Sequence, residues 1–124
     1  MKGIFVNSNG CIPYAKAIVK GIKPIETRNK NMLASCIGHT VAVIETRRGK
    51  NPTVVGYVDI VFAELKSGEW LDAHRDLTLI PKGSAYDNHG RAKWCYFLDN
   101  FRECKLPYSL PTNAVRHGRS WCEF

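Results

Sequence analysis

The stretch GIKPIETR, residues 21–28, decides how the rest of this 124-residue chain is interpreted. It carries three charges within six residues, Lys23, Glu26 and Arg28. Side chains of a strand alternate between its two faces, so Glu26 and Arg28 project on one side. Lys23 has the opposite parity, but the loop around Pro24 can turn it back toward them. A carboxylate flanked by two cations fits a binding or catalytic cluster, and the alternative is a solvated strand edge with one weak surface ion pair.

Before this stretch, the sequence predicts a strand and then a helix. Residues 3–7 form an apolar run, and residues 13–20 show apolar positions at helical spacing. Proline is well tolerated at a helix start because its missing amide hydrogen costs nothing there, which suits Pro13. Gly21 is a natural C-terminal cap, so it has a structural role beside any role in the motif. The predicted apolar stripe of this helix consists of Tyr14, Ala17, Ile18 and Ile22.

After this stretch, strands outnumber helices, and the helices lie between strands. This order predicts an α+β fold with a curved sheet or small barrel and helices at its ends. We find no repeat and no interdomain linker, so residues 1–124 are interpreted as a single domain. The expected elements are an extended segment 23–28, a helical turn 32–37, strands 39–46 and 53–65, a helix 68–78, a loop 81–90, a strand 93–101, an extended connector 107–111 and a last strand 120–124.

The same stretch resembles a family motif, Gly-x-Lys-x-x-Glu-x-Arg, at each specified position. The family is the ASCH domain, a branch of the PUA-like superfamily. The order of elements is also similar, including GYV at 56–58 and GRSW at 118–121, while residues 66–93 are less recognisable and are interpreted as a family-specific insertion. The resemblance implies a small PUA-like curved β-barrel with flanking helices. The residues that match the motif are Gly21, Lys23, Glu26 and Arg28.

The charge of the chain favours a polyanionic partner. Eighteen Lys and Arg residues stand against eleven Asp and Glu, which gives a formal net charge of +7 and a pI near 9.3. A basic domain of this size is typical of nucleic-acid binding, although charge that serves only solubility is the alternative.

The cysteines and the apolar runs predict a reduced, cytoplasmic protein. The five cysteines are odd in number and widely spaced, and they include no Cys-x-x-Cys pair. The four histidines show no paired ligand spacing, so we predict no metal site, and the sequence carries no recognised cofactor signature. No apolar run approaches the length of a membrane span, so no membrane association is expected.

The resemblance implies that the domain binds RNA or a nucleotide in a basic cleft floored by the motif. Lys23 and Arg28 would then contact the nucleic acid. Tyr14 and Trp121 are the aromatic residues expected near the motif, where they could stack on a base. Aromatic residues in such folds more often belong to the core, and that alternative applies to both.

An alternative prediction is a small hydrolase that uses the same cleft. Some relatives are amidohydrolases of acylated cytidine-type nucleosides that use a Lys, a Thr and a Glu, and others have been proposed as ribonucleases. Lys23 matches the Lys, but Glu26 stands where those relatives carry the Thr, and Thr27 is expected on the other strand face. If the protein is an enzyme, Lys23 and Glu26 are the predicted catalytic residues; otherwise they form a buried structural ion pair. The second acid would be Asp59 or Glu64.

Overall fold

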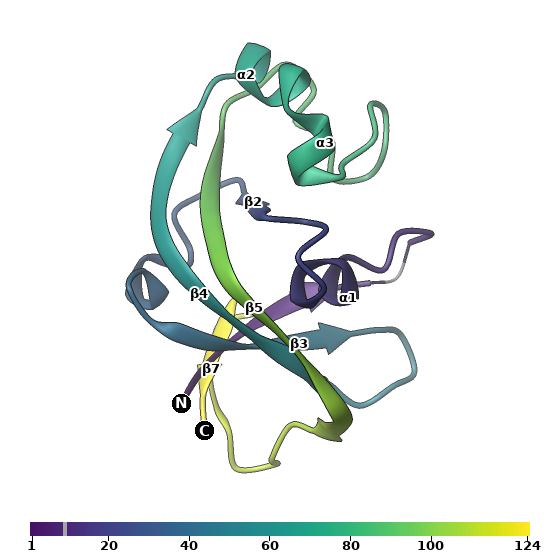
Figure 1. The fold of residues 1–124 in the computed structure, drawn as a ribbon, viewed down its shortest axis with the longest axis vertical. Helices are drawn as coiled ribbons and strands as arrows, with labels where there is room; N and C mark the ends of the chain where they lie inside the picture. The colour runs from purple at the N-terminus through teal and green to yellow at the C-terminus, as the bar shows by residue number, and fades with distance from the viewer. Residues whose placement is uncertain (9) are drawn as a thin grey trace.

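The computed structural model describes residues 1–8 and 10–124. It is a mixed α+β structure with short helices and one large sheet (Figure 1). The elements are β1 (Lys2–Asn7), α1 (Tyr14–Val19), β2 (Ile25–Arg28), η1 (Ala34–Cys36), β3 (Thr40–Thr46), β4 (Thr53–Lys66), α2 (Gly68–Ala73), α3 (Arg75–Thr78), β5 (Lys93–Ser109), β6 (Val115–His117) and β7 (Trp121–Glu123).

The sheet is strongly curved but does not close into a barrel, which corrects the predicted architecture. Its strand order is β2-β5-β4-β3-β1-β7-β6, with β1 and β3 parallel and the other pairs antiparallel. The edge strands β2 and β6 have four and three residues, and such short edges offer little backbone for a closing ladder. A side chain makes the contact between β2 and β1 instead, because Nη2 of Arg28 donates to the carbonyl of Phe5 at 2.6 Å.

Helix α1 packs inside the curve of the sheet and forms the main core with it (Figure 1). Ile18 is completely buried there between strand residues such as Ile4 and Val58. Gly56 of β4 permits this close packing, since a Cβ at that position would lie 2.6 Å from Cγ1 of Val19. The register of β4 against β5 also shifts between Val54 and Gly56.

The C-terminal cap of α1 turns the chain toward β2. Gly21 has a φ of +76°, the left-handed conformation that favours glycine. The amide of Gly21 donates to the carbonyl of Ile18, and the amide of Ile22 donates to that of Ala17, which is a Schellman motif. The helix therefore stops before Ile22, whose side chain is 58% exposed. Its predicted place in the apolar stripe is wrong for that reason.

The region from residue 66 to 93 contains two short helices where the sequence predicted one. His74 separates α2 from α3, with φ −122° and ψ 32°. Arg75 then fixes the loop that follows. Its guanidinium donates to the carbonyl of Ile80 at 2.9 Å and to Oδ1 of Asp87 at 3.0 Å. This loop is consequently held against α3 at two points.

The C-terminal third differs from expectation in two places. Strand β5 continues through Pro107 to Ser109, where an extended connector was predicted. Among the described residues, β2 pairs only with residues 94–97 of β5, and β4 pairs with Tyr108 but not with Pro107, so the missing amide hydrogen of this proline is tolerated. The short strand β6 was not predicted. Among the described residues, no helix is long and apolar enough to cross a membrane.

Candidate functional site

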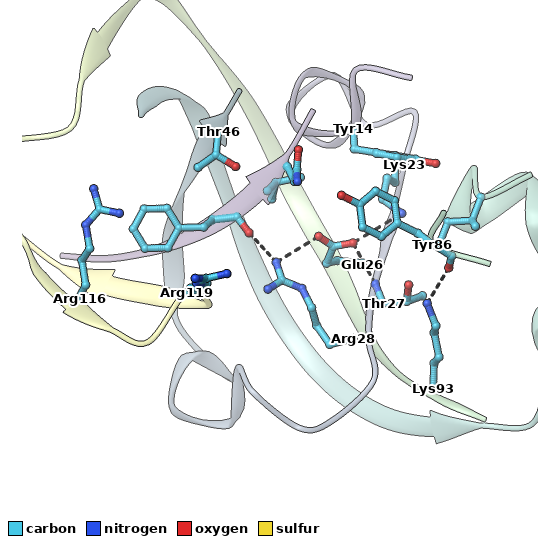
Figure 2. Close-up of a pocket in the computed structure, with 14 residues that line it drawn as sticks. Tyr14, Lys23, Glu26, Thr27, Arg28, Thr46, Tyr86, Lys93, Arg116 and Arg119 are labelled. Atoms are coloured by element: carbon cyan, nitrogen blue, oxygen red, sulfur yellow. Dashed lines mark hydrogen bonds and ion pairs between the residues drawn. The ribbon is translucent and has the colours of Figure 1, made fainter. Parts of the chain in front are cut away.

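A cavity of about 490 Å³ lies between the two ends of the open sheet. Most of its walls come from β1, from β2 and the segment before it, from the loop after α3, and from β6 with the turn that follows it (Figure 2). The volume is within the range of about 300–1,000 Å³ that is typical of small-molecule sites. The lining residues are Phe5, Val6, Asn7, Tyr14, Lys23, Glu26, Thr27, Arg28, Thr46, Ile80, Tyr86, Lys93, Arg116 and Arg119.

Lys23, Glu26 and Arg28 converge on this cavity, as their spacing predicted. Nζ of Lys23 lies 3.7 Å from Oε1 of Glu26, and Nη2 of Arg28 lies 3.3 Å from Oε2 of the same carboxylate. The loop at Pro24 therefore does turn Lys23 toward the face shared by Glu26 and Arg28.

The ammonium of Lys23 is buried and hydrogen-bonded to the backbone. It is 1% exposed, donates to the carbonyl of Ile25 at 2.8 Å, and also donates to the carbonyl of Thr78 at the end of α3. Burial lowers the pKa of Lys23, and the neighbouring Glu26 carboxylate counteracts only part of that effect. Two carbonyl acceptors and a carboxylate 3.7 Å away surround the amine, and this geometry describes its protonated form.

The carboxylate of Glu26 is held in its charged form. Burial acts to raise the pKa of Glu26, but the charges of Lys23 and Arg28 act in the opposite direction. The amide of Thr27 also donates to Oε1, at 3.0 Å. The net result is a pKa below the ordinary value, so Glu26 is an anion at neutral pH.

The loop after α3 and the start of β5 supply residues that the sequence analysis missed. Lys93, 8% exposed, donates from Nζ to the carbonyl of Tyr86 at 2.6 Å. Burial lowers the pKa of Lys93, with Glu26 and Asp87 acting against it. The ring of Tyr86 meets the ring of Tyr14 edge to face, with centroids 5.9 Å apart. The less recognisable region of the sequence thus forms one wall of the cavity.

The two ends of the cavity carry different chemistry (Figure 2). Tyr14 and Tyr86 lie at one end, and the ring of Tyr14 covers Nζ of Lys23 at 5.2 Å. Arg116 and Arg119 lie at the other end, where the guanidinium of Arg116 stacks over the ring of Phe5 at 5.0 Å.

Trp121 lies outside the cavity lining. Its ring stacks on His117, with centroids 4.1 Å apart, and the ammonium of Lys2 lies 5.4 Å from the ring centre. Trp121 also packs on the main core, so among the described residues the predicted base-stacking partner is not brought to the motif. The aromatic residue found beside Tyr14 is instead Tyr86.

The candidate second acids also lie away from the cavity. Asp59 is engaged with Thr40, Asn100 and Arg102, while Glu64 is exposed and pairs with Lys66 at 2.6 Å. Thr27 does contribute to the lining, although strand alternation placed it on the other face. In the described part of the chain, no group of three or more His, Cys, Asp or Glu side chains has the arrangement of a metal site.

The comparisons with known proteins identify the fold. No family model and no curated protein matches the sequence. The structure is similar to crystal structures of the ASCH protein from Zymomonas mobilis, with a TM-score of 0.66 and 17% identity over 87% of this chain and 73% of that one. A serine-to-alanine variant and a tyrosine-to-phenylalanine variant of that protein give the same TM-score, covering 74% and 77% of their chains. The chain has an ASCH-type fold, which is the resemblance that its motif predicted.

Proposed function

We propose that this ASCH-type domain binds RNA or a nucleotide in the cavity beside β2. The observation that carries the proposal is the charge of the lining, where five cationic side chains accompany a single carboxylate. Tyr14 and Tyr86 add aromatic surface on which a base can stack. Positive charge together with aromatic rings is what single-stranded nucleic-acid sites share.

The burial and hydrogen bonding of Lys23 favour binding over hydrolysis. A general base or nucleophilic amine needs a free lone pair, whereas this amine already donates to two backbone carbonyls and lies 3.7 Å from the Glu26 carboxylate. Its contacts span β2 and α3, so the residue also ties those elements together. The buried ion pair accordingly has a structural role that needs no substrate.

A small hydrolase is the second candidate, and the position of Glu26 in the cavity wall favours it. A buried carboxylate between two cations is a frequent feature of active sites. Its lowered pKa makes Glu26 a weak base at neutral pH, however, and a carboxylate cannot replace a hydroxyl nucleophile without forming a labile anhydride. Hydrolysis through a water molecule directed by Glu26 is the form of this activity that the site allows.

Binding is tested by titrating the protein with short single-stranded RNA at increasing salt. The affinity should fall as salt rises, because each neutralised phosphate releases counterions. Arg28→Ala should weaken binding more than Lys50→Ala, because Lys50 is exposed in the loop between β3 and β4. Arg119→Ala adds a variant that leaves the Glu26 ion pairs intact. Equal losses in all three variants would indicate diffuse surface attraction and contradict the proposal.

Turnover is tested by incubating the protein with acylated cytidine and with short RNA. We expect no release of the acyl group from the wild-type protein and none from Glu26→Gln. Glu26→Thr asks whether the pocket already fits such a nucleoside and lacks only the hydroxyl. Clear wild-type turnover that disappears in Glu26→Gln would overturn the binding proposal in favour of the hydrolase.

A further inference from the structure

The cations that line the cavity fall into two groups according to their hydrogen bonds. Lys23, Arg28 and Lys93 direct their donors at acceptors of the protein itself, including the carbonyls of Thr78, Phe5 and Tyr86. These three cations are committed to holding the walls in place. They raise the potential of the cavity, and each already makes at least one hydrogen bond to the protein before any ligand arrives.

Arg116 and Arg119 form the second group, and their donors face no acid. Both are exposed and flank the turn between β6 and β7, where Gly118 adopts a φ of +64°. Within residues 1–8 and 10–124, no carboxylate lies within ion-pair distance of either guanidinium. The guanidinium of Arg116 lies over the ring of Phe5, and such a cation–π contact does not use the hydrogen-bond donors of a guanidinium on an acceptor atom.

The opposite end of the cavity has aromatic surface in place of free charge. The ring of Tyr86 is part of the lining, and that residue is 40% exposed, so a flat ligand can approach it. Tyr14 buttresses Tyr86 edge to face. In Figure 2 this pair is well separated from Arg116 and Arg119, with Arg28 between them.

We propose that the cavity recognises a single phosphorylated nucleotide unit in a fixed direction. The phosphate lies on Arg116 and Arg119, and the base lies against Tyr86. Guanidinium groups bind phosphate through paired, charge-assisted hydrogen bonds, and tyrosine rings stack on bases. The volume of about 490 Å³ suits one nucleotide better than a long strand. This inference rests on the proposed function and adds that the phosphate is required.

The test compares ligands that differ only in phosphate, by calorimetry at fixed salt. The probes are the four ribonucleosides with their 5′- and 3′-monophosphates, and one RNA tetramer with a phosphate or a hydroxyl at each end. At least one phosphorylated form should bind about tenfold or more tightly than its unphosphorylated partner, because two charge-assisted contacts are lost without it. Preference among the monophosphates would identify a free nucleotide, and preference for a tetramer would identify an RNA end.

The matched variants separate the arginine pair from general charge. The double variant Arg116→Gln/Arg119→Gln should bind each phosphorylated ligand no more tightly than its unphosphorylated partner. Lys50→Gln with Lys105→Gln removes the same charge from exposed positions outside the lining and should leave the phosphate preference intact. Tyr86→Ala should weaken both forms of a ligand by the same factor, because it removes only the stacking surface.

The outcomes distinguish this inference from the proposed function. If the wild-type protein binds phosphorylated and unphosphorylated ligands equally, the phosphate site is wrong while nucleotide binding stands. If both double variants lose the preference equally, the effect is diffuse charge and the site assignment is overturned. If none of the probes binds, the proposed function itself fails, and this inference fails with it.

Discussion

The cavity has two cationic walls that differ in burial and in ion pairing. The β2 wall, formed by Lys23, Glu26 and Arg28, is largely buried, and its charges are paired within 4 Å. The C-terminal wall, formed by Arg116 and Arg119, is exposed, with no carboxylate partner among the described residues. Charges of the first kind stabilise a fold, whereas charges of the second kind are available to a ligand.

This difference changes what the stretch from Gly21 to Arg28 does in this chain. The motif residues lie at the place where the sheet fails to close, and Arg28 joins β2 to β1 there through the carbonyl of Phe5. A cavity at such a seam needs charged side chains that fasten its edges. The motif supplies them, while residues outside the motif supply the open cations and Tyr86.

The largest expected effect is on stability, from Lys23→Met. Methionine is also unbranched but one atom shorter and uncharged, so Glu26 and the carbonyls of Ile25 and Thr78 lose a buried donor. Breaking a buried pair typically costs about 3–5 kcal/mol, and we expect the lower end because Arg28 remains beside Glu26. Urea unfolding at pH 7 measures this loss in the free energy of unfolding. Arg119→Gln is the matched control from the C-terminal wall and should change the unfolding free energy by less than about 0.5 kcal/mol. A similarly small cost for Lys23→Met would contradict the structural role of the β2 wall.

The next effect is the pH dependence of Glu26→Gln. A carboxyl whose pKa is lowered by folding contributes stability that is complete above its unfolded pKa, about 4.3, and is lost as pH falls through the folded pKa. Glutamine mimics the protonated form. The free energy of unfolding of the wild-type protein should therefore exceed that of Glu26→Gln by about 1.5–3 kcal/mol at pH 7. This gap should narrow below about pH 4.

Urea midpoints from pH 7 to pH 3 measure this gap. Glu64→Gln is the control, since Glu64 is exposed and makes only a surface pair with Lys66, and its gap should stay near zero throughout. A gap for Glu26→Gln that is constant across the range would mean that Glu26 carries no folding-linked charge.

The sequence predicted most of the β2 wall because the relevant physics is local. Strand alternation paired Glu26 with Arg28, and the proline and glycine on either side of Lys23 marked the turn that brings it round. Barrel closure was not predictable in the same way. It depends on whether the edge strands β2 and β6 come close enough in space to pair, which is set by the curvature of the whole sheet and not by any one segment.

The other walls depend on long-range placement, which one sequence does not reveal. The ion pair between Arg75 and Asp87 fixes where Tyr86 returns to the cavity, and the irregular loop between them has no periodic pattern. In the C-terminal wall, Gly118 between two short β-branched or aromatic segments was an available hairpin signal. Reading 115–123 as a hairpin would have grouped Arg116 with Arg119 and paired His117 with Trp121, as the strand register does.

The smallest expected effect compares the two left-handed glycines, Gly21 before the β2 wall and Gly118 within the C-terminal wall. Alanine at either position carries the strain of a positive φ, about 1–2 kcal/mol. A Cβ on Gly21 would also lie 3.3 Å from the ring of Phe101, whereas a Cβ on Gly118 would meet nothing within 4 Å. Gly21→Ala should therefore destabilise the domain slightly more in urea unfolding. Gly118→Ala should reduce phosphorylated-nucleotide affinity more, because it shifts the turn that carries both arginines. If Gly21→Ala instead had the larger effect on that affinity, the β2 wall would be the one that holds the phosphate.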